Sequence, residues 1–92
     1  MSLHNDLPEA MRLLMSFLKD HEGKEIWFLL AESFIMGTLD RAPNDPRDGF
    51  TLTHATRYPP NGEKQKLDQA VLDVSQIIGW GGDPMNFLEV EG

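Results

Sequence analysis

Side chains that can do chemistry are concentrated in one turn-rich segment of this chain, Pro43 to Gly49 (PNDPRDG). The segment carries two carboxylates, an amide and a guanidinium, and its prolines, asparagine, aspartates and glycine predict a loop. Asn44, Asp45 and Asp48 faintly resemble the oxygen ligands of a calcium-binding loop. The resemblance is incomplete, because no glutamate follows at the distance where such a loop has its bidentate ligand. We therefore expect a solvated loop rather than a calcium site.

No other pattern points to catalysis or to a bound cofactor. His4, His21 and His54 are scattered along the chain, and the sequence contains no cysteine, so neither a metal site nor a nucleophilic cysteine is expected. The glycine-rich stretch from Gly79 to Pro84 lacks the lysine of a phosphate-binding loop. No serine lies in a nucleophile elbow. The sequence predicts a protein that is not an enzyme and has no metal and no cofactor.

Length and charge limit the classes of protein that remain. The chain has 92 residues and a net charge of −7, so it should repel nucleic-acid backbones unless its cations gather on one face. Five of its eight lysines and arginines fall between residues 41 and 66. With no apolar run of about 18 residues and no signal-peptide pattern, we expect a cytoplasmic protein without a membrane span. One domain is expected over residues 6–90, with residues 1–3 and 91–92 as cloning remnants.

The first element expected is a helix from about Asp6 to Glu22. Asp6 can cap the helix, Pro8 suits its first turn, and Glu9 is placed to complete a capping box. Gly23 is the expected C-terminal cap. Apolar residues recur at spacings of three and four and predict one apolar stripe, made of Leu7, Met11, Leu14, Met15 and Leu18.

Two apolar strands are expected after this helix. The first, Lys24 to Ala31 (KEIWFLLA), has few polar positions and is expected to be buried or half-buried on both faces. The second begins at Phe34, after a short turn, and contains Gly37 near its middle. Glycine inside a strand usually marks a bulge, a bend or a close backbone approach, so we expect the sheet to bend strongly at Gly37.

Three more strands and a short helix complete the predicted order. The third strand is Gly49 to Tyr58, whose inward residues are expected to be Phe50, Leu52 and either His54 or Ala55. After a polar loop over residues 59–66, strands are expected at Gln69–Val74 and Ile77–Trp80, followed by a short helix from Asp83. Because the connections are too short for parallel crossovers, the sequence predicts a mainly β fold: an N-terminal helix and a five-stranded, strongly bent antiparallel barrel.

This order of elements resembles the Sm-like family, which includes the LSm and Hfq-type proteins. The resemblance covers residues 7–80 and depends on the helix, Gly23, the strand KEIWFLLA, and the motif MGTL at Met36 to Leu39 with its bend glycine. The stretch from Ala70 to Trp80 is similar to the family's fourth and fifth strands. The resemblance implies a ring of subunits in which the fourth strand of one subunit pairs with the fifth strand of the next.

The family binds short single-stranded RNA at the pore of its ring, and the resemblance therefore implies candidate site residues in two segments. In the loop after the second strand they are Asn44, Asp45, Arg47 and Gly49. At the corner between the fourth and fifth strands they are Asp73, Ser75 and Gln76.

Oligomerisation is also expected from size, because a core of this length is marginal without disulfides or metals. The candidate interface residues are Val71, Val74, Ile77, Ile78 and Trp80, in a homo-oligomeric ring of five to seven subunits. The resulting hypothesis is a ring that binds single-stranded RNA or oligonucleotide at its pore. The alternative is a ring that serves as an assembly or protein-interaction scaffold without RNA binding, which the acidity of the chain favours.

Overall fold

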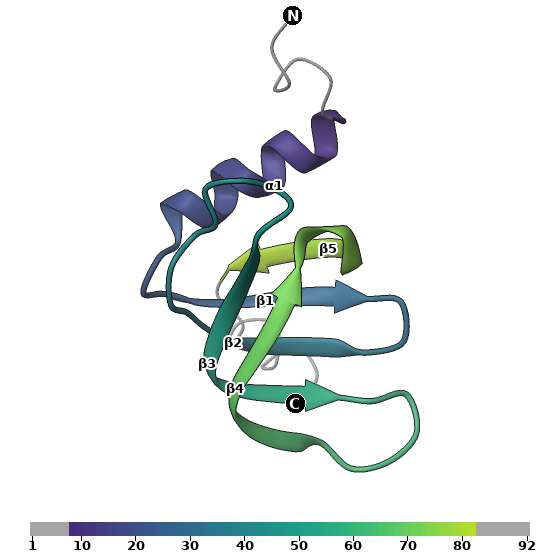
Figure 1. Cartoon of the computed structure of the whole chain (residues 1–92). Helices are drawn as coiled ribbons and strands as arrows, with labels where there is room; N and C mark the ends of the chain where they lie inside the picture. The colour runs from purple at the N-terminus through teal and green to yellow at the C-terminus, as the bar shows by residue number, and fades with distance from the viewer. Residues whose placement is uncertain (1–7, 83–92) are drawn as a thin grey trace, which may run out of the picture.

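The computed structural model describes residues 8–82, which form one helix and one bent antiparallel sheet (Figure 1). The elements are α1 (Glu9–Asp20), β1 (Glu25–Leu30), β2 (Phe34–Leu39), β3 (Gly49–Tyr58), β4 (Gln65–Asp73), a short 3-10 helix η2 (Val74–Gln76) and β5 (Ile77–Gly82). The predicted fold class, an N-terminal helix followed by a five-stranded, strongly bent antiparallel barrel, is confirmed as a helix followed by five antiparallel strands in one bent sheet. Helix α1 lies across one end of the sheet, while the hairpin of β3 and β4 extends away from it.

Helix α1 is shorter than the sequence predicts. It begins after Pro8, which has an extended backbone and provides no side-chain cap, and its C-terminal cap is His21, whose N–H donates to the carbonyl of Leu18 (3.1 Å). Gly23 then turns the chain with φ of 77°, a left-handed conformation that glycine adopts at little cost. The expected cap at Asp6 and the expected helix from Asp83 lie outside the described residues. No helix within residues 8–82 is long and apolar enough to cross a membrane.

The strands are ordered β4-β3-β2-β1-β5, and every neighbouring pair is antiparallel. Among the described residues β4 and β5 do not pair with each other, so each is an edge strand. The prediction that the fourth strand begins at Gln69 is wrong, because β4 begins at Gln65, which pairs with Arg57. Ladder hydrogen bonds come from the backbone, so a polar stretch can extend a hairpin without an apolar face.

The sheet bends at Gly37, where the pairing between β2 and β3 is irregular. The register shifts between Met36 and Thr38, so that Gly37 faces two residues of β3. A Cβ on Gly37 would lie 3.1 Å from both the Cα of Ala55 and the carbonyl oxygen of Thr53, which is closer than ordinary contact. The expected bend at Gly37 is therefore present, with glycine permitting the close approach.

The bend also decides which residue of β3 points inward. His54 is exposed and has φ of 51°, an uncommon value for a residue other than glycine, whereas Ala55 is buried. His54 is thus the extra residue of a β-bulge, and the alternation of β3 changes phase there. Ala55 rather than His54 joins the core.

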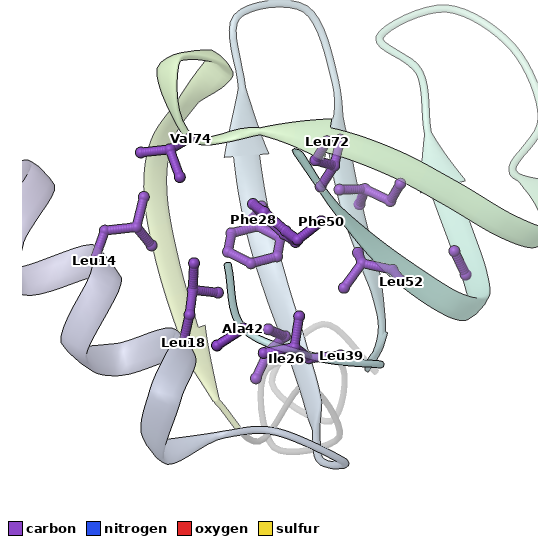
Figure 2. Close-up of a cluster of buried hydrophobic side chains, with 12 residues drawn as sticks. Leu14, Leu18, Ile26, Phe28, Leu39, Ala42, Phe50, Leu52, Leu72 and Val74 are labelled. Atoms are coloured by element: carbon purple, nitrogen blue, oxygen red, sulfur yellow. The ribbon is translucent and has the colours of Figure 1, made fainter. Parts of the chain in front are cut away.

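The core lies between α1 and the concave face of the sheet, where side chains of both converge (Figure 2). Leu14 and Leu18 of α1 point toward Phe28 and Val74. Strand β1 buries one face fully through Ile26 and Phe28, while Leu29 on its other face is exposed, so the expected burial of both faces is only partly realised. The buried hydrophobic residues of this cluster are Leu14, Leu18, Ile26, Phe28, Ile35, Leu39, Ala42, Phe50, Leu52, Ala55, Leu72 and Val74.

Candidate nucleic-acid interface

The two candidate segments, 43–49 and 73–76, lie side by side in the folded chain. Gly49, the last residue of the first segment, begins β3 and pairs with Asp73, which ends β4 and precedes the corner η2. A Cβ on Gly49 would lie 3.3 Å from the carbonyl oxygen of Leu72, so glycine lets β4 approach closely at this point. The fold therefore joins residues 24 positions apart in sequence (73 − 49) into one surface at the end of the β3–β4 ladder.

Hydrogen bonds join the residues just before segment 43–49 to the residues that follow α1. The Ala42 N–H donates to the Glu22 carboxylate at 2.7 Å, and Ala42 and Pro43 are buried. Nearby, the N–H of Gly23 donates to the carbonyl of Leu39 at 2.8 Å. These hydrogen bonds fix the direction in which the loop leaves the sheet, a role for Glu22 that the sequence pattern did not predict.

The tip of the first segment is a β-turn held by its own first residue. The Asp48 N–H donates to the carbonyl of Asp45 at 2.9 Å, and the Arg47 N–H donates to the Asp45 carboxylate at 2.8 Å. Aspartate at the first position and Pro46 at the second favour this turn, since aspartate caps the backbone and proline fixes φ. The turn is thus specified locally by its four residues.

Within this turn the side chains of Asp45 and Arg47 form a two-pronged ion pair. Nε of Arg47 lies 3.1 Å from Oδ1 of Asp45, and Nη2 lies 3.1 Å from Oδ2. Hydrogen bonding to Asp45, together with the Asp45 charge, raises the pKa of the Arg47 guanidinium above its ordinary value, and the charge of Asp48 adds to this. Arg47 is nevertheless open to solvent, with 81% of its side chain exposed against 40% for Asp45.

The second segment is a capping box. Asp73 accepts a hydrogen bond from the Ser75 N–H (3.0 Å), and its own N–H donates to Oε1 of Gln76 (2.8 Å). Reciprocal bonds of this kind satisfy backbone donors at the start of a helix, here the 3-10 turn η2. The side chains of Asp73 and Gln76 therefore shape the corner, while Ser75 is exposed beside them.

Asn44 lies in a groove that sequence reasoning did not find. It forms one wall with Pro43 and Pro46, and helix α1 forms the other wall, in a groove of about 300 Å³. The helix contributes two cations, Arg12 and Lys19, to this groove. Their spacing of seven residues places them on the same side of a helix, but only the folded structure brings this side next to the loop. Arg12 and Lys19 therefore place positive charge beside the site made of segments 43–49 and 73–76, whose own ionisable side chains are mainly acidic.

The candidate interface residues divide into exposed and buried groups. Val71 on β4 is 73% exposed and Ile78 on β5 is 63% exposed, and both belong to edge strands. Ile77 and Trp80 are half-buried and pack against the core. Val74 is only 3% exposed and belongs to the core, because η2 turns its side chain under α1. Val74 is therefore not available for contact with another copy.

Residues 8–82 contain no group of three or more histidine, aspartate or glutamate side chains arranged to hold a metal ion. Two of the three acidic side chains at the site, those of Asp45 and Asp73, instead accept hydrogen bonds from backbone N–H groups.

Comparison with known proteins identifies the fold. No protein-family model matches the chain, and no curated protein matches it in sequence. Among solved structures, a heptameric archaeal Sm protein is similar, with a TM-score of 0.61 and 21% sequence identity. The match covers 75% of this chain and 98% of the archaeal chain. The helix, the five bent antiparallel strands and this likeness together define the Sm fold.

Proposed function

We propose that copies of this chain assemble edge to edge into a ring of five to seven subunits, with β4 of one copy pairing with β5 of the next. Within residues 8–82, β4 and β5 each have one edge without a pairing strand. These edges support the assembly, because each offers backbone donors and acceptors that another strand can satisfy. The exposed side chains of Val71 and Ile78 lie on those edges. The heptameric state of the archaeal Sm protein is consistent with it.

Light scattering coupled to size-exclusion chromatography tests the assembly. The parent should elute with the mass of five to seven copies, and Ile78→Lys should shift it to smaller species because a charge is placed in the contact. Leu13→Lys is the matched control, since Leu13 is also exposed (57%) but belongs to α1 rather than to an edge strand. A parent that scatters as a monomer at micromolar concentration would overturn the assembly.

We further propose that the assembled ring binds single-stranded RNA or oligonucleotide at the surface formed by residues 43–49 and 73–76. The observation that carries this proposal is the Gly49–Asp73 pairing, which joins the two segments on the Sm fold. In this proposal Asn44 and Gln76 contribute polar contacts, and Arg12 and Lys19 attract phosphates along the groove beside Asn44. Repetition around a ring would combine weak contacts by avidity.

Fluorescence polarisation with labelled U-rich and A-rich oligoribonucleotides at low salt tests the binding. Arg12→Ala and Lys19→Ala should each weaken binding, whereas Lys64→Ala, between β3 and β4, should leave it nearly unchanged. If neither oligonucleotide binds below about 100 μM, the affinity of weak non-specific contacts, the RNA proposal fails.

A ring that acts as a protein-interaction scaffold is the second candidate function. It is favoured by the net charge of −7 and by three carboxylates at the proposed site, those of Asp45, Asp48 and Asp73. Like charges repeated around a ring would oppose phosphate entry. An assembled ring without oligonucleotide binding in the polarisation assay would support this function.

A further inference from the structure

The Asp45–Arg47 pair has the geometry that arginine uses to bind phosphate. Two parallel N–H···O contacts of 3.1 Å join one edge of the guanidinium to both oxygens of the carboxylate. Phosphate is bound by arginine through the same fork, with two oxygens facing two N–H groups. The carboxylate of Asp45 therefore occupies the Nε–Nη2 edge, one of the two edges through which Arg47 can bind a phosphate in this way.

The pair is also formed with little loss of entropy. Asp45 is already fixed by the turn, because its carboxylate accepts the Arg47 N–H at 2.8 Å and its carbonyl accepts the Asp48 N–H at 2.9 Å. Only the side chain of Arg47 has to be ordered. A carboxylate held two residues away is present at high effective concentration, whereas a phosphate in solution must come from outside.

We propose that Asp45 is an internal competitor for phosphate, which masks Arg47 and determines what the loop can recognise. The inference rests on the proposed function, since it concerns the nucleic-acid surface described above. With its edge occupied, Arg47 keeps its planar faces in solvent, consistent with the 81% exposure of its side chain. A planar guanidinium face stacks on a nucleobase. Asp45 thus weakens the attraction of Arg47 for phosphates and leaves the guanidinium faces available to bases.

A comparison of Asp45→Asn with Asp48→Asn isolates this effect. Both substitutions remove one negative charge from the same turn, but only Asp45 forms the two side-chain bonds with Arg47. Asparagine at position 45 still offers an oxygen to the Arg47 N–H, so the turn is retained. Thermal melting monitored by circular dichroism verifies that both variants are folded.

The measurement is fluorescence polarisation with labelled U-rich and A-rich oligoribonucleotides between about 50 and 200 mM salt. Asp45→Asn should tighten binding by up to about fivefold for each protomer the strand contacts, the upper range for release of an exposed ion pair. The slope of log K against log salt should steepen by about 0.7 for each new phosphate contact. Asp48→Asn should give a smaller gain in affinity. Adding Arg47→Ala to Asp45→Asn should abolish the gain that Asp45→Asn gives alone.

The outcomes separate this inference from the proposed function. A parent that does not bind, with an Asp45→Asn variant that binds through Arg47, supports the masking and overturns RNA binding by the native chain. A parent that binds, with equal gains from the two asparagine variants, overturns the masking and leaves RNA binding standing. Absence of binding by every variant overturns both.

Discussion

Replacement of Gly37 tests the close approach on which the bend of the sheet depends. An added Cβ would lie 3.1 Å from two backbone atoms of β3, whereas ordinary contacts begin at 3.4 Å. Backbone atoms in a hydrogen-bonded ladder cannot move aside as the end of a flexible side chain can. The strain must therefore be relieved by displacing β3 from β2.

The magnitude follows from two opposing contributions. Overpacking of this kind costs about 1–3 kcal/mol, and the loss of glycine's freedom in the unfolded chain returns about 0.4–1 kcal/mol. Gly37→Ala should therefore destabilise by about 1 kcal/mol, within that range. Gly37→Val, which adds two more methyl groups in the same space, should cost about 3 kcal/mol, although valine favours strands.

Thermal unfolding at one fixed protein concentration measures the effect. For a domain of this size each kcal/mol lowers Tm by about 4–8 °C, so Gly37→Val should melt about 12–24 °C below the parent. Gly79→Ala is the matched control, because its Cβ would lie 3.6 Å from the Cβ of Leu29, an ordinary contact. A Gly37→Val protein that melts within a degree or two of the parent would show that this approach is not strained.

Two further predictions concern the segments that form the proposed site. Glu22→Ala leaves the buried Ala42 N–H without its acceptor and should cost about 1–2 kcal/mol in urea denaturation, with faster amide exchange at Ala42, while Glu22→Gln should retain most of the stability. Equal stability of the alanine variant and the parent would contradict this role. Asp73→Ala removes the cap of η2 and should cost about 0.5–2 kcal/mol, whereas Asp73→Asn keeps an acceptor for the Ser75 N–H. Indistinguishable unfolding of the two Asp73 variants would show that the cap contributes little.

The sequence was informative where a pattern repeats over a short distance. Apolar spacing predicted that α1 would bury Leu14 and Leu18, and a glycine inside an apolar strand predicted the bend at Gly37. The capping box at the corner was not predicted, although its two side chains, Asp73 and Gln76, stand at the three-residue spacing typical of such a box. The sequence signal for each of these features lies within a few residues.

Features that depend on distant residues were not predicted. The first residues of β4 are polar and read as a loop, but they pair with β3 through the backbone. The contact between Glu22 and Ala42 spans 20 residues, and no local pattern signals it. Likewise Arg12 and Lys19 face the loop only because α1 lies across the end of the sheet. The burial of Val74 depends on the same packing.

The capping box at η2 has a consequence for the number of copies in the proposed assembly. The two edge strands, β4 and β5, are separated by only the three residues of η2, whose conformation is held by hydrogen bonds within the corner. The angle between the two edges is therefore set inside one chain before any copy meets another. Head-to-tail contacts give a closed ring or an open filament according to the rotation from one copy to the next. Inserting one residue into η2 would alter this rotation while leaving both edges intact, so the corner is where the symmetry of the assembly can be changed.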